Sequence, residues 1–107
     1  MKRLKHKRLI RFKIINLIDQ KVTEISLYCR KNPMKQALNK IFKDHELIDC
    51  QRMFKRDKGH PDYMIKKGLY TLYVEFKSPS DSVHTSQIEW IFKNPNKKTI
   101  ILHQLDY

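Results

Sequence analysis

Three short stretches of the sequence carry side chains that could do chemistry together: Gly59-His60-Pro61-Asp62, Glu75-Phe76-Lys77 and Gln87. Between them they supply two carboxylates, an ammonium group and an amide. Carboxylate oxygens are ligands that Mg²⁺ prefers in proteins, and a bound metal lowers the pKa of a water molecule and neutralises charge on a reacting phosphate. A lysine beside them would stabilise developing negative charge. The set therefore predicts metal-assisted hydrolysis of a phosphodiester.

The spacing of these residues predicts how they meet. Glu75 and Lys77 are two positions apart, so in a β-strand their side chains leave the same face. Residues 61–66 and 69–77 predict two strands joined by a tight turn at Lys67-Gly68. Because that turn folds the second strand back on the first, we expect Asp62 to lie near Glu75 and Lys77 at one edge of a sheet.

The N-terminal third predicts a basic hairpin. Residues 1–8 form a basic arm, and apolar and polar residues then alternate over 9–18 and 22–29. Alternation with a period of two predicts two antiparallel strands, with apolar side chains on one face and basic ones on the other. A short helix over 22–30 is the alternative.

A helix and a strand are predicted between the two hairpins. Asn32-Pro33 is typical of a helix start, with Asn as the N-cap and Pro at the first helical position. Apolar residues recur at helical spacing to about Asp44. Residues 47–54 predict a strand, and a basic loop follows as far as Gly59.

The C-terminal part predicts a helix and a last strand. Residues 78–81 form a loop, and either Asp81 or Ser80 is expected to cap a helix over about 82–93 that carries Gln87. A β-branched strand over 99–103 ends the pattern. The whole order predicts a mixed α/β fold with its sheet flanked by helices. We expect one domain of 107 residues, divided into a basic arm and hairpin (1–31) and a core (32–107).

The charge is unevenly distributed along the chain. The net charge is +12, and residues 1–43 hold 13 Lys and Arg against only Asp19 and Glu24, a net of +11. A protein with such an excess usually meets an anionic partner. The first half therefore predicts phosphate binding, whereas most of the acids, which a cation site requires, lie in the second half.

The pattern Pro61-Asp62 … Glu75-Phe76-Lys77 resembles the PD-(D/E)XK nuclease superfamily. Residues 59–91 (GHPDYMIKKGLYTLYVEFKSPSDSVHTSQIEWI) look most like its VRR-NUC branch, which is similar to Holliday junction resolvases. The resemblance covers about residues 33–104. Positions that match that branch are Gly59, Pro79, Gln87 and Trp90.

This resemblance implies a restriction-endonuclease-like mixed sheet and a set of roles. Asp62 and Glu75 would hold Mg²⁺ or Mn²⁺, with the backbone carbonyl of Phe76 as a third ligand. Lys77 would be the catalytic lysine, and Gln87 would lie near the metal waters or the scissile phosphate. The family often has an acid on the helix before the first motif strand, but residues 33–43 contain none. Asn32 or Gln36 occupies that region, and the nearby acids Glu24, Asp44 and Glu46 have no clear place in the pattern. A single metal is therefore expected.

The implied substrate is DNA, duplex or branched, cut by a homodimer. The side chains expected to contact nucleic acid are Lys2, Arg3, Lys5, Lys7, Arg8, Arg11, Lys13, Arg52, Lys55, Arg56, Lys58 and His60. For His60, a plain loop position is the alternative. RNA as the substrate, and endonucleolytic or exonucleolytic cleavage, are left open by the sequence.

Two other functions compete with this one. The first is a catalytically decayed nuclease-fold module that binds nucleic acid without cleaving it, which the missing helix acid favours. The second is a basic adaptor that docks on a protein or membrane partner through residues 1–30. The sequence carries neither a signal-peptide pattern nor an apolar span of about 18 residues. We therefore expect a cytoplasmic protein (host-cell cytoplasm for a viral chain) with no membrane association and with Cys29 and Cys50 as reduced thiols.

Overall fold

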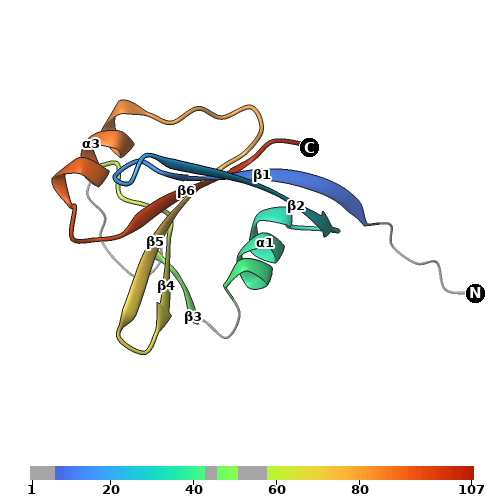
Figure 1. The fold of residues 1–107 in the computed structure, drawn as a ribbon, viewed down its shortest axis with the longest axis horizontal. Coiled ribbons are helices and arrows are strands. Elements are labelled where there is room, and N and C mark those ends of the chain that lie inside the picture. The colour runs from blue at the N-terminus through green and yellow to red at the C-terminus, as the bar shows by residue number, and fades with distance from the viewer. Residues whose placement is uncertain (1–6, 43–45, 51–57) are drawn as a thin grey trace, which may run out of the picture.

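The computed structural model describes residues 7–42, 46–50 and 58–107. These residues form a six-stranded mixed sheet with the strand order β2-β1-β6-β5-β4-β3 (Figure 1). The elements of this described part are β1 (Arg8–Asn16), β2 (Lys21–Cys29), α1 (Pro33–Ile41), β3 (Glu46–Asp49), β4 (Tyr63–Lys67), β5 (Tyr70–Lys77), α3 (Thr85–Lys93) and β6 (Thr99–Gln104). The predicted mixed α/β fold is confirmed.

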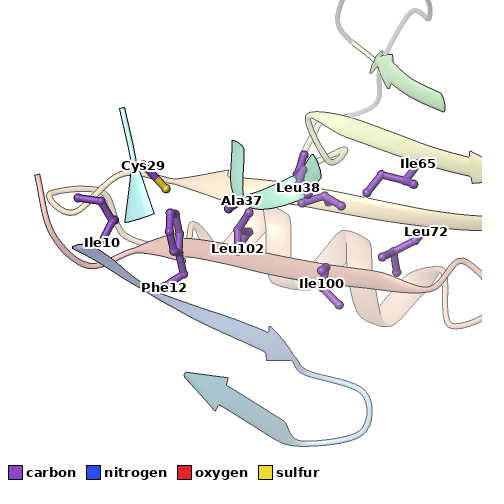
Figure 2. Packing of buried hydrophobic residues seen from close by; sticks show 10 residues of the cluster. Ile10, Phe12, Cys29, Ala37, Leu38, Ile65, Leu72, Ile100 and Leu102 are labelled. Atoms are coloured by element: carbon purple, nitrogen blue, oxygen red, sulfur yellow. The ribbon is translucent and has the colours of Figure 1, made fainter. Parts of the chain in front are cut away.

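One helix covers each face of the sheet. Leu102 of β6 packs with Leu38 of α1 in the larger cluster of buried residues. The preceding residue, Ile101, packs with Trp90 of α3 in a second cluster. Because successive strand residues point to opposite faces, α1 and α3 lie on opposite sides, and we call these sides the α1 face and the α3 face. Figure 2 shows the larger cluster, whose side chains come from the strands and from α1.

The N-terminal hairpin has the predicted form. β1 and β2 pair without interruption from Arg8 opposite Cys29 to Asn16 opposite Lys21. Phe12 is fully buried on the α1 face, whereas its neighbour Arg11 is exposed. The helical alternative over 22–30 is wrong, because every residue of β2 is paired with β1. The hairpin joins the rest of the sheet where β1 runs antiparallel to β6.

The second hairpin turns one residue later than predicted. Lys67 is paired with Tyr70, so the loop consists of Gly68 and Leu69 rather than Lys67 and Gly68. Gly68 has a φ of 59°. A two-residue hairpin loop requires this left-handed conformation at its first position, which glycine adopts without a steric penalty.

The helix α3 starts three residues later than predicted. It begins at Thr85, after His84 as the N-cap residue, and neither Ser80 nor Asp81 caps it. The carboxylate of Asp81 instead accepts hydrogen bonds from the hydroxyl of Ser78 at 2.7 Å and from its backbone N–H at 3.3 Å. This acid therefore closes the loop after β5. The crossover through α3 then brings β6 parallel to β5.

Two further boundaries differ from the prediction. Asn32 precedes α1 in a left-handed conformation (φ 49°) and makes no side-chain cap hydrogen bond, and the helix ends at Ile41 instead of about residue 44. The side-chain oxygen of Gln36 instead accepts a hydrogen bond from the N–H of Arg30 at 3.0 Å, which holds the segment before the helix against α1. β3 ends at Asp49, opposite Tyr63 at the start of β4, and the N–H of Cys50 still donates to the carbonyl of Asp62 at 2.9 Å. The predicted remainder of this strand, residues 51–54, lies outside the described residues.

Neither described helix has the length and apolar composition that crossing a membrane requires.

Candidate active site at the ends of β4 and β5

The two carboxylates meet where the β4–β5 ladder ends. Tyr63 is paired with Val74, so the next positions outward, Asp62 and Glu75, face each other. Side chains opposite each other in an antiparallel pair are about 5 Å apart at Cβ. One carboxylate oxygen of Asp62 also accepts the backbone N–H of Phe76 at 3.2 Å. Asp62, the residue before β4, thereby accepts a hydrogen bond from β5. This bond holds the Asp62 side chain beside Glu75.

Lys77 completes the cluster predicted from the sequence. Its Nζ lies 3.6 Å from Oε2 of Glu75, and the two side chains are only 6% and 5% exposed. Both residues share the α3 face with Tyr73, whereas Val74 and Phe76 pack toward α1. The structure thus brings Asp62, Glu75 and Lys77 together as expected, with Asp62 the most accessible of the three.

Gln87 connects the helix α3 to this cluster. Its side-chain nitrogen donates to Oε2 of Glu75 at 2.8 Å. Its side-chain oxygen accepts the backbone N–H of His84 at 2.9 Å, which is one of the amides left without an intrahelical partner at the start of α3. The two bonds hold the amide in one orientation. Gln87 therefore places a donor on Glu75 and anchors the beginning of the helix at the same time.

A close approach at Gly59 sets the position of the loop that carries Asp62. Gly59 has a φ of 82°, and a Cβ atom there would lie 2.1 Å from the backbone oxygen of Ser86 in α3. Only glycine fits this contact. The loop then leads through Pro61, which is buried, into Asp62. The distance from α3 to the loop, and hence from Gln87 to the carboxylates, depends on this absence of a side chain.

The electrostatics of Glu75 are strongly perturbed. Burial, and then the neighbouring carboxylate of Asp62, raise the pKa of Glu75 to about 8, although Lys77 opposes the shift. Its second oxygen, Oε1, is buried without a hydrogen-bond partner. A buried acceptor without a partner costs about 1–3 kcal/mol. The site therefore has an acceptor atom in need of a positive or hydrogen-bonding ligand.

The cluster offers two carboxylates to a metal ion. Within the described ranges, no group of three or more His, Cys, Asp or Glu side chains could hold a metal. The helix α1 contributes no acid, and the side chain of Gln36 is committed to the backbone of Arg30 and Lys31. Mg²⁺ is usually held by one or two carboxylates together with water and phosphate. Asp62 and Glu75 meet that requirement for one ion.

The predicted nucleic-acid contacts are only partly within the described chain. Residues 2, 3, 5, 52, 55 and 56 lie outside it. Lys58 is exposed, and so are Lys7 and Arg8 at the start of β1. Arg11 forms a two-pronged ion pair with Asp106, at 2.9 and 3.0 Å. This pair holds the pKa of Asp106 down at about 2, so part of the Arg11 charge is used within the protein.

Lys13 lies in line with the site across the sheet. Lys77 is paired with His103 of β6, and His103 is paired with Lys13 of β1. Paired residues share a face, so these three side chains form a row on the α3 face, about 5 Å from strand to strand. We call them the basic row. The sequence did not indicate it, because the neighbours of β6 follow only from the strand order.

His60 is placed among aromatic rings. Its ring contacts those of Trp90 and Tyr73 edge-on, with centroids 4.8 and 5.7 Å apart. Its Nδ1 lies 2.8 Å from the carbonyl of Pro61. Tyr73 is a neighbour of the site that was not predicted from the sequence, although the alternation Tyr73, Glu75, Lys77 along one strand could have indicated it.

No protein family model, curated protein or solved structure matches the chain.

Proposed function

We propose that the protein is a metal-dependent nuclease that hydrolyses phosphodiester bonds in DNA. The observation that carries the proposal is the convergence of Asp62, Glu75 and Lys77 at one pair of strand ends, with Gln87 bonded to Glu75. Glu75 and Lys77 are almost fully buried, and taking charged groups out of water is costly, so their burial favours a functional role. Hydrolysis of a phosphate ester uses all three.

The donor set fits a divalent cation. Two carboxylates face each other with a single lysine to offset their charge, and Oε1 of Glu75 lacks a partner. Asp62 and Glu75 would hold Mg²⁺ or Mn²⁺, and the resemblance adds the carbonyl of Phe76. The ion, when bound, polarises the phosphate and lowers the pKa of a bound water.

The chain's own groups have separable tasks in this proposal. Lys77, held by Glu75, supplies a fixed positive charge in a site with little water, where it stabilises negative charge on the phosphate oxygens more strongly than it would in solvent. Gln87 holds the Glu75 carboxylate in place from α3. The N–H of Phe76 does the same for Asp62. Preorganised groups of this kind lower the barrier because they need no reorientation during the reaction.

DNA is the substrate that the charge and the resemblance favour. The net charge is +12, and the basic row extends from Lys77 toward β1 on the same face as the carboxylates. A mixed sheet flanked by helices is compatible with the restriction-endonuclease-like fold that the resemblance implies. We propose that the enzyme acts as a homodimer, because cutting both strands of a duplex requires two sites. Branched DNA is then a structure-specific substrate.

A decayed nuclease-fold module that only binds nucleic acid is the second candidate. The observations that favour it are the absence of an acid in α1 and the nearly complete burial of Glu75 and Lys77. It predicts salt-dependent DNA binding without turnover.

The test compares matched pairs of variants on labelled DNA. Asp62→Asn and Lys77→Met remove charge from the cluster, while Glu89→Gln and Lys93→Met make the same changes on the exposed surface of α3. Linear, single-stranded, flapped and four-way-junction DNA are incubated with Mg²⁺, Mn²⁺ or EDTA, and circular dichroism checks folding. We expect metal-dependent cleavage that falls at least about a hundredfold in the cluster variants only. Full activity in either cluster variant would refute the assignment, and binding without cleavage under both metals would establish the second candidate.

A further inference from the structure

A pocket lies on the α1 face of the sheet, near the ends of β4 and β5 that carry Asp62 and Glu75. It has a volume of about 270 Å³ and is lined by Asn32, Pro33, Met34, Lys35, Tyr63 and Phe76. We call it the Tyr63 pocket. Tyr63 directly follows Asp62 in the chain, and Phe76 lies between Glu75 and Lys77. Neighbouring Cα atoms are about 3.8 Å apart, so the pocket begins one residue away from each proposed catalytic group.

The lining has the composition of a nucleobase site. The rings of Tyr63 and Phe76 contact each other in a tilted arrangement, with centroids 4.6 Å apart and planes 31° apart. Aromatic side chains of this kind bind bases by stacking, whatever the base. Pro33 and Met34 add apolar surface, Lys35 adds an exposed positive charge, and Asn32 adds an amide that is not used to cap its helix. An amide can both donate to and accept from the edge of a base.

The pocket has a rigid inner wall. Met34, Tyr63 and Phe76 are partly buried and pack against the larger core cluster, together with residues of α1 and the sheet. The aromatic surface is therefore held in place before a ligand arrives, which limits the entropy lost on binding.

The pocket and the carboxylates lie on opposite faces of the same strand ends. Tyr63 and Phe76 pack toward α1, whereas Glu75 shares the α3 face. A base stacked in a duplex follows the path of its phosphate and could not reach the other face. A base that is already unpaired can swing away from the backbone, and swinging it out costs least when it has no partner.

We propose that the Tyr63 pocket binds an unpaired nucleobase next to the phosphate held at Asp62 and Glu75. The protein then acts on DNA that has at least one unpaired nucleotide beside the cleavage point, such as a flap, a gap or a junction. This inference rests on the proposed function, because it assigns the base to the substrate of that same site.

The experiment measures binding apart from cleavage. In EDTA, affinities are compared for a fully paired duplex and for a flapped duplex of the same length that carries 2-aminopurine as its first unpaired base. Met34→Trp fills the pocket, and Met34→Leu is the size-matched control because such swaps are tolerated in packed positions. We expect the wild type and Met34→Leu to bind the flapped DNA roughly tenfold more tightly than the duplex, within the range that stacking of one base provides.

Met34→Trp is expected to lose this preference while its affinity for the duplex stays close to that of the wild type, and circular dichroism checks that it folds, because Met34 also packs against the core. The fluorescence of 2-aminopurine is expected to be quenched by the wild type and by Met34→Leu. Equal affinity of the wild type for both DNAs, or an unchanged preference in folded Met34→Trp, would overturn the pocket assignment. A preference without cleavage in Mg²⁺ would support the pocket and refute the nuclease, whereas Glu75-dependent cleavage without any preference would do the reverse.

Discussion

Glu75 contacts three side chains with opposite effects on its ionisation. Asp62 favours its neutral form, whereas Lys77 favours its charged form, and burial adds to the effect of Asp62. Gln87 donates to one of its oxygens. The balance leaves the group protonated well above the pH at which an exposed glutamate ionises. A divalent ion would compete with that proton for the same oxygens.

Stability without metal should therefore depend on pH through Glu75. The folded-state pKa is raised from 4.5 to about 8, so this group stabilises the fold fully below about pH 4.5, and the contribution is lost as the pH rises through 8. Glu75→Gln removes the titration. We expect Glu75→Gln to gain on the order of 2 kcal/mol in free energy of unfolding over the wild type between pH 5 and pH 9, less than the full shift because solvent and Lys77 offset part of it. Urea unfolding of both proteins in EDTA measures this, and a difference that does not change with pH would contradict it.

Gln87 should matter for both stability and metal binding. Gln87→Met keeps the length of the side chain but loses the acceptor for His84 and the donor to Glu75. We expect a loss of about 1–3 kcal/mol in free energy of unfolding, because a helix-start amide and a buried carboxyl each lose a partner. Titration calorimetry should show weaker Mg²⁺ binding. Ile88→Met, an exposed position on the same helix, is the control, and an equally small effect of both changes would show that Gln87 is only a surface residue.

At the level of the elements, the contact between α3 and the loop before β4 determines whether the site is assembled. The helix supplies Gln87, and the loop supplies Asp62. They are held together where Gly59 meets the backbone of Ser86. The two glycines of the chain therefore make a matched test, since Gly68 also has a positive φ but has no atom within 4 Å of where its Cβ would lie.

Gly59→Ala should destabilise the fold more than Gly68→Ala. Both changes place alanine in a left-handed conformation, which costs about 1–2 kcal/mol. At Gly59 the new methyl group also collides with Ser86, so we expect a total of about 2–4 kcal/mol and weaker Mg²⁺ binding as the loop moves from α3. Denaturant unfolding and metal titration of the two variants test this. Equal losses would mean that the close contact does not hold the loop.

The sequence predicted the two hairpins better than the helix ends. Apolar and polar residues alternate over β1 and β2 with the period of a strand, which a short segment shows directly. The spacing of Asp62, Glu75 and Lys77 around one glycine turn is likewise a local feature. The predicted start of α3 was wrong because Asp81 bonds to Ser78 instead of capping the helix. A residue type that favours caps does not show which of these two interactions forms. The contact of Gln87 with Glu75 depends on how the crossover places α3 against the sheet. The basic row depends on the strand order. Neither can be read from a short segment of sequence.

On the scale of the whole molecule, the charge is concentrated where it can guide a polyanion. The basic row connects the buried site to β1, where Lys13 is also paired with Glu24 of β2. Exposed charges separated by more than about 10 Å are screened at 0.1 M salt, so the local row should contribute more to affinity than the distant charges.

DNA affinity should fall steeply with salt. If about five phosphates are contacted, the logarithm of the association constant should fall with the logarithm of salt concentration with a slope of about −4.5. Lys13→Gln should reduce this slope by about one. Lys97→Gln, which removes a cation near the ring of Trp90 and outside the basic row, should leave it unchanged. Fluorescence anisotropy at several salt concentrations measures the slopes, and a slope near zero would exclude phosphate-driven binding.

One of the two central strands of the sheet, β6, is also the last of the described strands along the chain. β6 lies between β1 and β5, and Phe12 is paired with Gln104. Each hairpin can form from local contacts, but neither can be joined to the other until β6 arrives, so closure of this long loop should limit the folding rate. Arg8 reaches the carbonyl of Tyr107, and the N–H of Leu105 bonds to Arg11. A circular permutant in which a short linker leads from β6 directly into β1 would make the slowest pairing local, and it should fold faster in stopped-flow experiments while keeping the same native contacts.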